Sequence, residues 1–388
     1  MSADANDQCM SVAQQWIRPE IRELSAYHVP DASGLIKLDA MENPYSWPEQ
    51  LVDQWLESLR GAAINRYPDP DARQLVDDLR DVYAIPQQAG ILLGNGSDEL
   101  IQLITMAVSG SMSSGSMSSG SISESNATRT IVTLEPGFSM YRMIATFTGM
   151  DYVGVPLRND FTLDLESLLA AIETHQPAVV FIAYPNNPTG NLFDLEDVRQ
   201  VIEVSPGMVV VDEAYFAFAG TTVMPLLDQY ENLLVLRTLS KMGLAGLRLG
   251  FLAASSECIE EFNKIRLPYN INTLTQISAS FALQHHDIFE QQTACLRKDR
   301  ESLLSALSTH ASLTVYPSQA NFILFRTAQG QAEQIFDHLL EQGVLIKNLH
   351  KSGGALLDCL RVTVGTAEEN DAFLQALNSA LIDVVETR

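Results

Sequence analysis

A lysine between two apolar runs is the first residue of this 388-residue chain that could carry chemistry. Residues 233–236 form a run of strand length, and residues 247–254 form a second run that contains Arg248. Lys241 stands between them in a turn rich in glycine and alanine. A lysine held there beside hydroxyl groups and an arginine can be desolvated, which lowers the pKa of its amine and makes it a nucleophile near neutral pH. The alternative is a surface lysine in a glycine-rich turn.

The motif GNGSDE at residues 94–99 is a glycine turn that opens a helix. Gly96 permits a tight backbone there, and the amides of Ser97 and Asp98 are expected to point toward an anion at the positive end of the helix. The motif lacks the third glycine of a dinucleotide fingerprint and the Gly-Lys-Ser/Thr of a P-loop. The motif therefore supports neither a dinucleotide-binding nor a P-loop nucleotide site. Its functional interpretation is a phosphate cup, a set of backbone amides that bind a phosphate group.

Two further polar motifs, YPNNPTG at residues 184–190 and DEAY at 212–215, each follow an apolar run. Considered alone, YPNNPTG is interpreted as a turn and DEAY as the N-cap of a helix. Together with the lysine and the anion cup, they supply an asparagine, a carboxylate and a tyrosine. One ligand uses all of these groups: pyridoxal phosphate needs an anion cup, a carboxylate at its ring nitrogen, a donor to its phenolate oxygen and a lysine that forms a Schiff base.

The elements that must position these residues are short apolar strands that alternate with helical stretches. Such alternation predicts an α/β fold, in which helices sandwich a mostly parallel sheet and ligands bind beyond the carboxyl ends of the strands. Each predicted strand ends in one of the polar motifs or in EPGFSMY; the strands are residues 91–93, 130–134, 178–183, 208–211 and 233–236.

The chain is expected to divide into two domains. Residues 38–269 form the large domain, and residues 270–388 form a smaller α+β domain, to which an N-terminal arm, residues 1–37, contributes. A long helical tract, residues 273–309, joins them. Helices are also predicted at 50–63, 72–83 (capped by Asp71), 332–342 and 367–385. A Ser/Gly/Met repeat within 109–127 is too polar to order itself and predicts a flexible surface loop.

Composition excludes several classes of function. The formal net charge of −24 argues against nucleic acid or an anionic membrane as a partner and favours a soluble cytoplasmic protein. The four cysteines form no CxxC pair and the seven histidines no ligand set, so neither a disulfide framework nor a metal site is expected. No apolar run is long enough to span a bilayer, and the N-terminus lacks the pattern of a signal peptide.

The motifs GNGSDE, PNNPTG, DEAY, TLSK, GLAGLR and CLRVTVG occur in this order. In that combination the chain resembles the fold type I pyridoxal-phosphate-dependent aminotransferases, over nearly its whole length. Within them it is similar to the histidinol-phosphate aminotransferases, on LDAMENPY, NRYPDP and CLRVTVGT. The resemblance implies transamination between L-histidinol phosphate or imidazole-acetol phosphate and glutamate or 2-oxoglutarate, in histidine biosynthesis.

The resemblance also implies roles for individual residues at the cofactor. Lys241 would form the Schiff base and then carry the proton between the substrate α-carbon and C4′ of the cofactor, and Asp212 would pair with the ring nitrogen. Asn187 and Tyr215 would hydrogen-bond the phenolate oxygen, and Phe138 would stack on the ring. The implied contacts to the cofactor phosphate are those of Gly96, Ser97, Asp98, Thr238, Ser240 and Arg248.

A second set of implied roles concerns the substrate and a neighbouring subunit. Tyr67 would reach the cofactor phosphate of the other subunit, which implies a homodimer. Arg361 would bind the α-carboxylate of the amino acid, a bidentate role that suits arginine. Tyr27 and Asn43 would line the substrate entrance. Lys347 stands where many relatives have an arginine for the substrate phosphate. Its ammonium is a point charge and lacks the paired N–H donors of a guanidinium.

Two alternatives remain open on the sequence. The first keeps the cofactor and changes the reaction, to an aromatic or other 2-oxo-acid aminotransferase or a phospho-amino-acid decarboxylase. The second is a non-catalytic, aminotransferase-like sensor domain of a transcription regulator. Such regulators carry a basic helix-turn-helix ahead of this domain, and the segment before Tyr27 is too short and too acidic for one.

Overall fold

The computed structural model describes residues 11–26, 29–110 and 129–386. Tyr27 and all but the first two residues of the predicted 109–127 loop lie outside these ranges. Within them, no helix is both long enough and apolar enough to cross a membrane.

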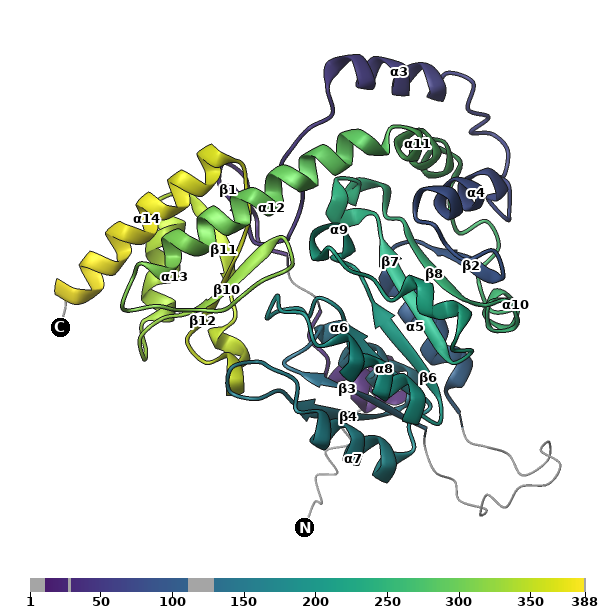
Figure 1. Cartoon of the computed structure of the whole chain (residues 1–388), viewed down its shortest axis with the longest axis horizontal. Helices are drawn as coiled ribbons and strands as arrows, with labels where there is room; N and C mark the ends of the chain where they lie inside the picture. Colours follow the sequence, from purple (N-terminus) through teal and green to yellow (C-terminus); the bar gives the residue numbers. More distant parts are fainter. Residues whose placement is uncertain (1–10, 27–28, 111–128, 387–388) are drawn as a thin grey trace, which may run out of the picture.

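A seven-stranded sheet forms the larger half of the molecule, with the order β2-β8-β7-β6-β5-β3-β4 (Figure 1). The pairs from β7 through β6, β5 and β3 to β4 are parallel, and only β8 runs against its neighbours β7 and β2. All five predicted strands therefore point the same way, whereas β4 was not predicted. The bounds are β2 (Ala89–Gly94), β3 (Thr130–Glu135), β4 (Asp151–Pro156), β5 (Val179–Ala183), β6 (Met208–Asp212), β7 (Leu233–Thr238) and β8 (Gly250–Ser255).

Helices cover both faces of this sheet because successive strand residues point to opposite sides. Val209 and Val211 of β6 pack in one buried cluster, and Val210 between them packs in another. The first cluster includes α4 (Arg73–Val82), α7 (Leu165–His175), α8 (Leu195–Val204) and α11 (Thr273–Gln284). The second includes α5 (Ser97–Val108), α6 (Ser139–Thr148) and α10 (Ser256–Asn263). The predicted α/β class, a mostly parallel sheet between helices, is confirmed.

A smaller five-stranded sheet has the order β1-β11-β12-β10-β9 and its own buried cluster. The N-terminal strand β1 pairs in parallel with β11, so the predicted boundary at residues 37/38 falls inside a strand of this sheet; the division into domains stays a prediction. Figure 1 shows α12 running from α11, beside the larger sheet, across to α13 and α14. The bounds are β1 (Ile36–Leu38), β9 (Thr314–Val315), β10 (Phe322–Arg326), β11 (Val344–Asn348), β12 (Cys359–Thr363), α12 (His286–Ser308), α13 (Ala332–Glu341) and α14 (Ala367–Glu386).

Two predictions about helices are wrong. Asp71 does not cap the helix that follows it: Ala72 occupies the N-cap position, and Asp69 accepts the hydrogen bond from the Arg73 amide at 3.2 Å. The predicted tract 273–309 is two helices that meet at His285. The ring nitrogen Nδ1 of His285 lies 2.9 Å from the Phe281 carbonyl oxygen, the acceptor that a continuous helix would use for a backbone amide.

The remaining elements are short segments outside the two sheets. They are α1 (Val12–Trp16), α2 (Pro19–Arg22), α3 (Glu49–Leu59), α9 (Phe216–Ala219) and the 3₁₀ helices η1 (Met224–Asp228), η2 (Ser240–Met242), η3 (Ala245–Leu247), η4 (His350–Ser352) and η5 (Gly354–Leu356).

Candidate active site

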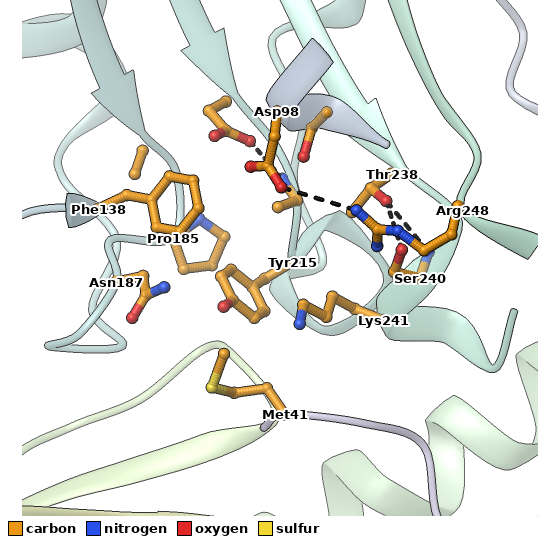
Figure 2. Close-up of a pocket in the computed structure, with 14 residues that line it drawn as sticks. Met41, Asp98, Phe138, Pro185, Asn187, Tyr215, Thr238, Ser240, Lys241 and Arg248 are labelled. Carbon is orange, nitrogen blue, oxygen red and sulfur yellow. Dashed lines mark hydrogen bonds and ion pairs between the residues drawn. The ribbon is translucent and has the colours of Figure 1, made fainter. Parts of the chain in front are cut away.

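A pocket lies where the carboxyl ends of the parallel strands face the smaller sheet (Figure 2). It is lined by most of the residues predicted to hold a cofactor: Ser97, Asp98, Phe138, Asn187, Asp212, Tyr215, Thr238, Ser240, Lys241 and Arg248. Sequence reasoning missed four further lining residues, Met41, Ala183, Pro185 and Ala214. Met41 enters from the segment after β1 and forms the side of the pocket opposite Asp98 in Figure 2.

Lys241 lies in η2, immediately after β7, and its amine points into this pocket. The amine donates a hydrogen bond to the Ala40 carbonyl at 3.1 Å. Desolvation, together with the positive charge of Arg361, lowers the pKa of Lys241 to about 8. An appreciable fraction of the amine is therefore neutral, and nucleophilic, near neutral pH.

Asp212 ends β6 and is 4 % exposed. Its carboxylate accepts hydrogen bonds from the Tyr141 hydroxyl at 2.8 Å and from the Ala214 amide at 3.1 Å. Desolvation raises the pKa of Asp212 to about 6, and these two hydrogen bonds act in the opposite direction. The side chain is thus a buried carboxylate held in place at the pocket wall, the group that a cationic ring nitrogen would pair with.

Tyr141 is the functional residue that sequence reasoning missed most clearly. It lies on α6, fully buried, with its ring stacked on Phe181 at 4.7 Å between centroids. The available signal was its spacing: Tyr141 follows Phe138 by three residues, which places the two side chains on one face of a helix. Their rings meet edge to face at 5.5 Å.

An anion site forms where α5 begins. Its first helical residue is Ser97, and the N-cap Gly96 has φ +87° and makes no side-chain cap bond. The guanidinium of Arg248 packs against Gly96, where an added Cβ would lie 2.5 Å from Nη2, and it is 3.6 Å from Asp98 Oδ2. The hydroxyls of Thr238 and Ser240 are hydrogen-bonded at 2.9 Å on the same wall (Figure 2). Open amides, two hydroxyls and an arginine suit a phosphate group.

Arg361 is not among the residues that line the pocket, but it links the smaller sheet to the lining residue Asn187. It lies on β12, is 6 % exposed, and donates a hydrogen bond to Asn187 Oδ1 at 2.5 Å and to the Asp39 carbonyl at 3.2 Å. Lys347 on β11 stands opposite Arg361 in the strand register and is outside the pocket lining. The ring of Tyr215, buried at the pocket, packs edge to face against Phe322 at 5.2 Å.

Asn43 and Tyr67, two further predicted residues, lie outside this pocket. Asn43 donates hydrogen bonds to the Met242 carbonyl and to Gln292 Oε1, both at 2.9 Å, and lines a separate cavity beside the lysine turn. Tyr67 is 80 % exposed and stacks on Tyr269 at 4.4 Å, away from the pocket of its own chain. Tyr27 belongs to the residues that the structure does not describe.

The pocket fits pyridoxal phosphate by the chemistry of its donor set. The α5 end would take the phosphate, Asp212 the ring nitrogen, Phe138 a ring face, and Lys241 the reactive carbon. Within residues 11–26, 29–110 and 129–386, no group of histidine, cysteine and acidic side chains could hold a metal ion.

Comparison with known proteins yields one family. The model of the aminotransferases of class I and II matches residues 33–377. The chain is 56 % identical, over 94 % of its length and 97 % of the relative's, to a histidinol-phosphate aminotransferase 2 of Nitrosococcus oceani. It is 50 % identical, over 94 % of its length and 97 % of the relative's, to a histidinol-phosphate aminotransferase of Chromobacterium violaceum.

A solved structure of similar fold is the histidinol-phosphate aminotransferase of Sinorhizobium meliloti in complex with pyridoxal 5′-phosphate. The TM-score is 0.81 at 24 % identity, over 94 % of this chain and 97 % of that one. At this identity the likeness supports the fold alone.

Proposed function

This chain belongs to the class I and II aminotransferases, which depend on pyridoxal phosphate, and on that premise we propose that it is a histidinol-phosphate aminotransferase. It moves the amino group of glutamate to imidazole-acetol phosphate and yields L-histidinol phosphate and 2-oxoglutarate, a step of histidine biosynthesis. The observation that carries the substrate assignment is the 56 % identity, over 94 % of the chain, to a relative of that name.

The residues of the pocket divide the work of the reaction. Pyridoxal phosphate, when bound, supplies a ring that withdraws electrons from the substrate's α-carbon. The neutral amine of Lys241 would attach the cofactor and, once released, would carry the proton between the substrate's α-carbon and C4′ of the cofactor. The Asp212 carboxylate holds a proton on the ring nitrogen, and Tyr141 and the Ala214 amide fix that carboxylate. Arg248, Ser240, Thr238 and the amides at the start of α5 bind the phosphate.

Substrate binding falls to residues at the edge of the smaller sheet. Arg361 binds the α-carboxylate of glutamate, and its hydrogen bond to Asn187 aims the guanidinium. Asn187 and Tyr215 donate to the phenolate oxygen of the cofactor. Lys347, adjacent to Arg361 in the sheet, supplies a positive charge to the phosphate of histidinol phosphate. Tyr27 and Asn43 would line the substrate entrance.

The assembly proposed is a homodimer in the cytoplasm. Two segments that are tied by hydrogen bonds, from Arg266 to the Pro70 carbonyl and from Gln276 to the Asp69 carbonyl, carry exposed apolar side chains. Those side chains are Ile64, Tyr67, Leu267, Tyr269 and Leu274. A second copy covering this surface would remove apolar area from water and would bring Tyr67 to the partner's cofactor phosphate. The acidic composition supports the cytoplasmic assignment.

The test of the substrate is a comparison of half-reactions. The holoenzyme is mixed with histidinol phosphate, with phenylalanine or with phosphothreonine, and loss of the cofactor's visible band and release of carbon dioxide are followed. Histidinol phosphate should react fastest by orders of magnitude, without carbon dioxide. Faster reaction of phenylalanine would identify an aromatic aminotransferase, and carbon dioxide from phosphothreonine would identify a decarboxylase. The alternatives are tested because Lys347 replaces the arginine that binds the substrate phosphate in many relatives, and an ammonium binds phosphate less specifically than a guanidinium.

A further inference from the structure

A buried ion pair lies directly behind the strand ends that carry the cofactor residues. Glu213 and Arg237 are 0 % and 3 % exposed. Two N–H groups of Arg237, Nε and Nη2, donate to Glu213 Oε2 at 2.9 and 2.8 Å. Glu213 accepts two more hydrogen bonds, from the Thr222 hydroxyl at 2.8 Å and from the Val223 amide at 2.6 Å. The carboxylate is therefore fully hydrogen-bonded.

Each member of the pair is the chain neighbour of a cofactor residue. Glu213 follows Asp212, which ends β6, and Arg237 precedes Thr238, which ends β7. Consecutive strand residues point to opposite faces, so Asp212 and Thr238 share one face of the sheet while Glu213 and Arg237 share the other. The packing agrees with this: Tyr141, which bonds Asp212, belongs to the cluster on one face, and Val223, which bonds Glu213, belongs to the cluster on the other.

The ion pair is linked to the lysine turn through Tyr83. The Arg237 guanidinium lies 4.2 Å from the centroid of Phe216 and 5.4 Å from that of Tyr83. The Tyr83 hydroxyl donates a hydrogen bond to the sulfur of Met242 at 3.0 Å, and Met242 is the residue after Lys241. Asp212, Thr238 and Lys241, which line the pocket, are thus each the sequence neighbour of a residue in one buried network. The neighbours are Glu213, Arg237 and Met242.

We propose that Glu213 and Arg237 are positioning residues, which fix the ends of β6 and β7 relative to each other and so hold Asp212 and Thr238 at the spacing that pyridoxal phosphate requires. The proposal rests on the proposed cofactor site and names residues outside the pocket lining as part of its function. Geometry favours positioning over stabilisation. Buried ion pairs add little net stability compared with apolar pairs of equal size, whereas two N–H groups converging on one oxygen fix direction as well as distance.

The test separates positioning from stability by removing both charges at once. In full-length Glu213→Gln/Arg237→Met, no charge remains in this part of the core, and the glutamine can still hydrogen-bond the Val223 amide and the Thr222 hydroxyl, so the midpoint of thermal unfolding of the cofactor-free protein should be close to that of the wild type. Affinity for pyridoxal phosphate, measured by titration of the cofactor-free protein and followed by visible absorbance, should still be about 10- to 100-fold weaker, because the loss of one charge-assisted hydrogen bond from a misplaced Asp212 lowers affinity to that extent.

Two further variants complete the design. Arg237→Lys keeps the positive charge and loses the paired N–H groups; it should bind the cofactor at least about 10-fold more weakly and serves the same comparison if the double variant does not fold. Leu168→Ala, a buried residue of α7, should lower the thermal midpoint and leave cofactor affinity unchanged.

The outcomes are distinct. Wild-type affinity in the double variant, or in Arg237→Lys, overturns the positioning role. Equal loss of affinity in Leu168→Ala overturns it as well, because reduced stability alone would then account for the effect. A wild-type protein that does not bind pyridoxal phosphate contradicts the proposed cofactor site instead.

Discussion

The hydroxyl of Tyr141 donates a hydrogen bond to Asp212 Oδ2 at 2.8 Å, and both side chains are buried on the same face of the large sheet. Desolvation raises the pKa of Asp212 to about 6, and this hydrogen bond opposes the rise. Asp212 pairs with a protonated ring nitrogen only when it is ionised, so the bond to Tyr141 extends the pH range over which the site can hold its cofactor.

Replacing Tyr141 with phenylalanine should move that pH range. The ionised form of Asp212 is present above its pKa and is lost as the pH falls through it. In the wild type, affinity for pyridoxal phosphate should therefore fall as the pH drops through about 6. In Tyr141→Phe the pKa of Asp212 rises further and the fall begins at a higher pH. A hydrogen bond to a charged group contributes about 1.5–3 kcal/mol, so affinity near the transition should drop at least about 10-fold.

The matched control for this change is Tyr152→Phe. The Tyr152 hydroxyl also donates to a carboxylate, Glu135 at 3.0 Å, but neither residue lines the cofactor pocket. Cofactor titrations over a pH series should show the wild-type transition in this variant. An unmoved transition in Tyr141→Phe would mean that the hydroxyl does not tune Asp212.

Gly96→Ala should weaken the phosphate cup. The added Cβ would lie 2.5 Å from Arg248 Nη2, so the guanidinium must move away from the start of α5. Loss of one charge-assisted hydrogen bond, about 1.5–3 kcal/mol, predicts about 10- to 150-fold weaker binding of pyridoxal phosphate. The affinity of inorganic phosphate, measured by its competition with the cofactor, should fall in parallel.

Gly34→Ala is the control for backbone strain. Gly34 has φ +77°, close to the +87° of Gly96, but nothing lies within 4 Å of its added Cβ. Both variants should therefore lose free energy of unfolding to backbone strain, roughly 1–3 kcal/mol at Gly96, whose ψ of 164° lies in a region that only glycine commonly occupies. If Gly34→Ala binds the cofactor as weakly as Gly96→Ala, the contact with Arg248 is not the cause.

Changes at Lys347 should affect phosphorylated substrates selectively. Lys347→Ala should lower kcat/KM for histidinol phosphate by about 10- to 100-fold, because an ionic hydrogen bond to phosphate is lost. Lys347→Arg should raise it by a few-fold, because the guanidinium binds phosphate through two N–H groups. Steady-state rates with phenylalanine, which has no phosphate, serve as the internal control. A parallel fall with both substrates in Lys347→Ala would place the substrate phosphate elsewhere.

Leu267→Glu should break the proposed dimer. Leu267 is 71 % exposed in one chain, and a charge there would have to be buried in the interface. Sedimentation should find monomers, with weakened cofactor binding because Tyr67 no longer reaches the partner's site. Ile382→Glu changes another exposed aliphatic residue, 60 % exposed on α14, and should stay dimeric. A dimeric Leu267→Glu protein with normal cofactor affinity would contradict the proposed interface.

The sequence predicted the parts of the fold that depend on local pattern. Continuous apolar runs marked β3, β5, β6 and β7, and the polar motifs after them identified the edge where the pocket lies. The strand β4 was missed because Gly154 interrupts its apolar run and its end residues, Asp151 and Pro156, are exposed at the sheet edge.

Contacts between distant segments could not be predicted in the same way. Met41 lines the pocket because β1 joins the smaller sheet beside β11, some 300 positions later in the chain, a pairing that no local pattern encodes. The bond between Tyr141 and Asp212 depends on how α6 packs against β6. The cap of α4 was misassigned because Asp69 and Asp71 are chemically alike, and only the backbone path decides which carboxylate faces the amide of Arg73.

The central claim is that Lys241 carries pyridoxal phosphate and that the protein uses it on histidinol phosphate. The measurement that tests it most directly is the visible absorbance of the full-length protein before and after addition of histidinol phosphate, for the wild type, Lys241→Ala and Lys264→Ala, a lysine with 64 % side-chain exposure. The wild type and Lys264→Ala should show a visible band that bleaches with histidinol phosphate, and borohydride should fix the cofactor to Lys241. Lys241→Ala should have no lysine-linked band and no turnover. A band that persists in Lys241→Ala with full activity, or no band in the wild type supplied with pyridoxal phosphate, would contradict the claim.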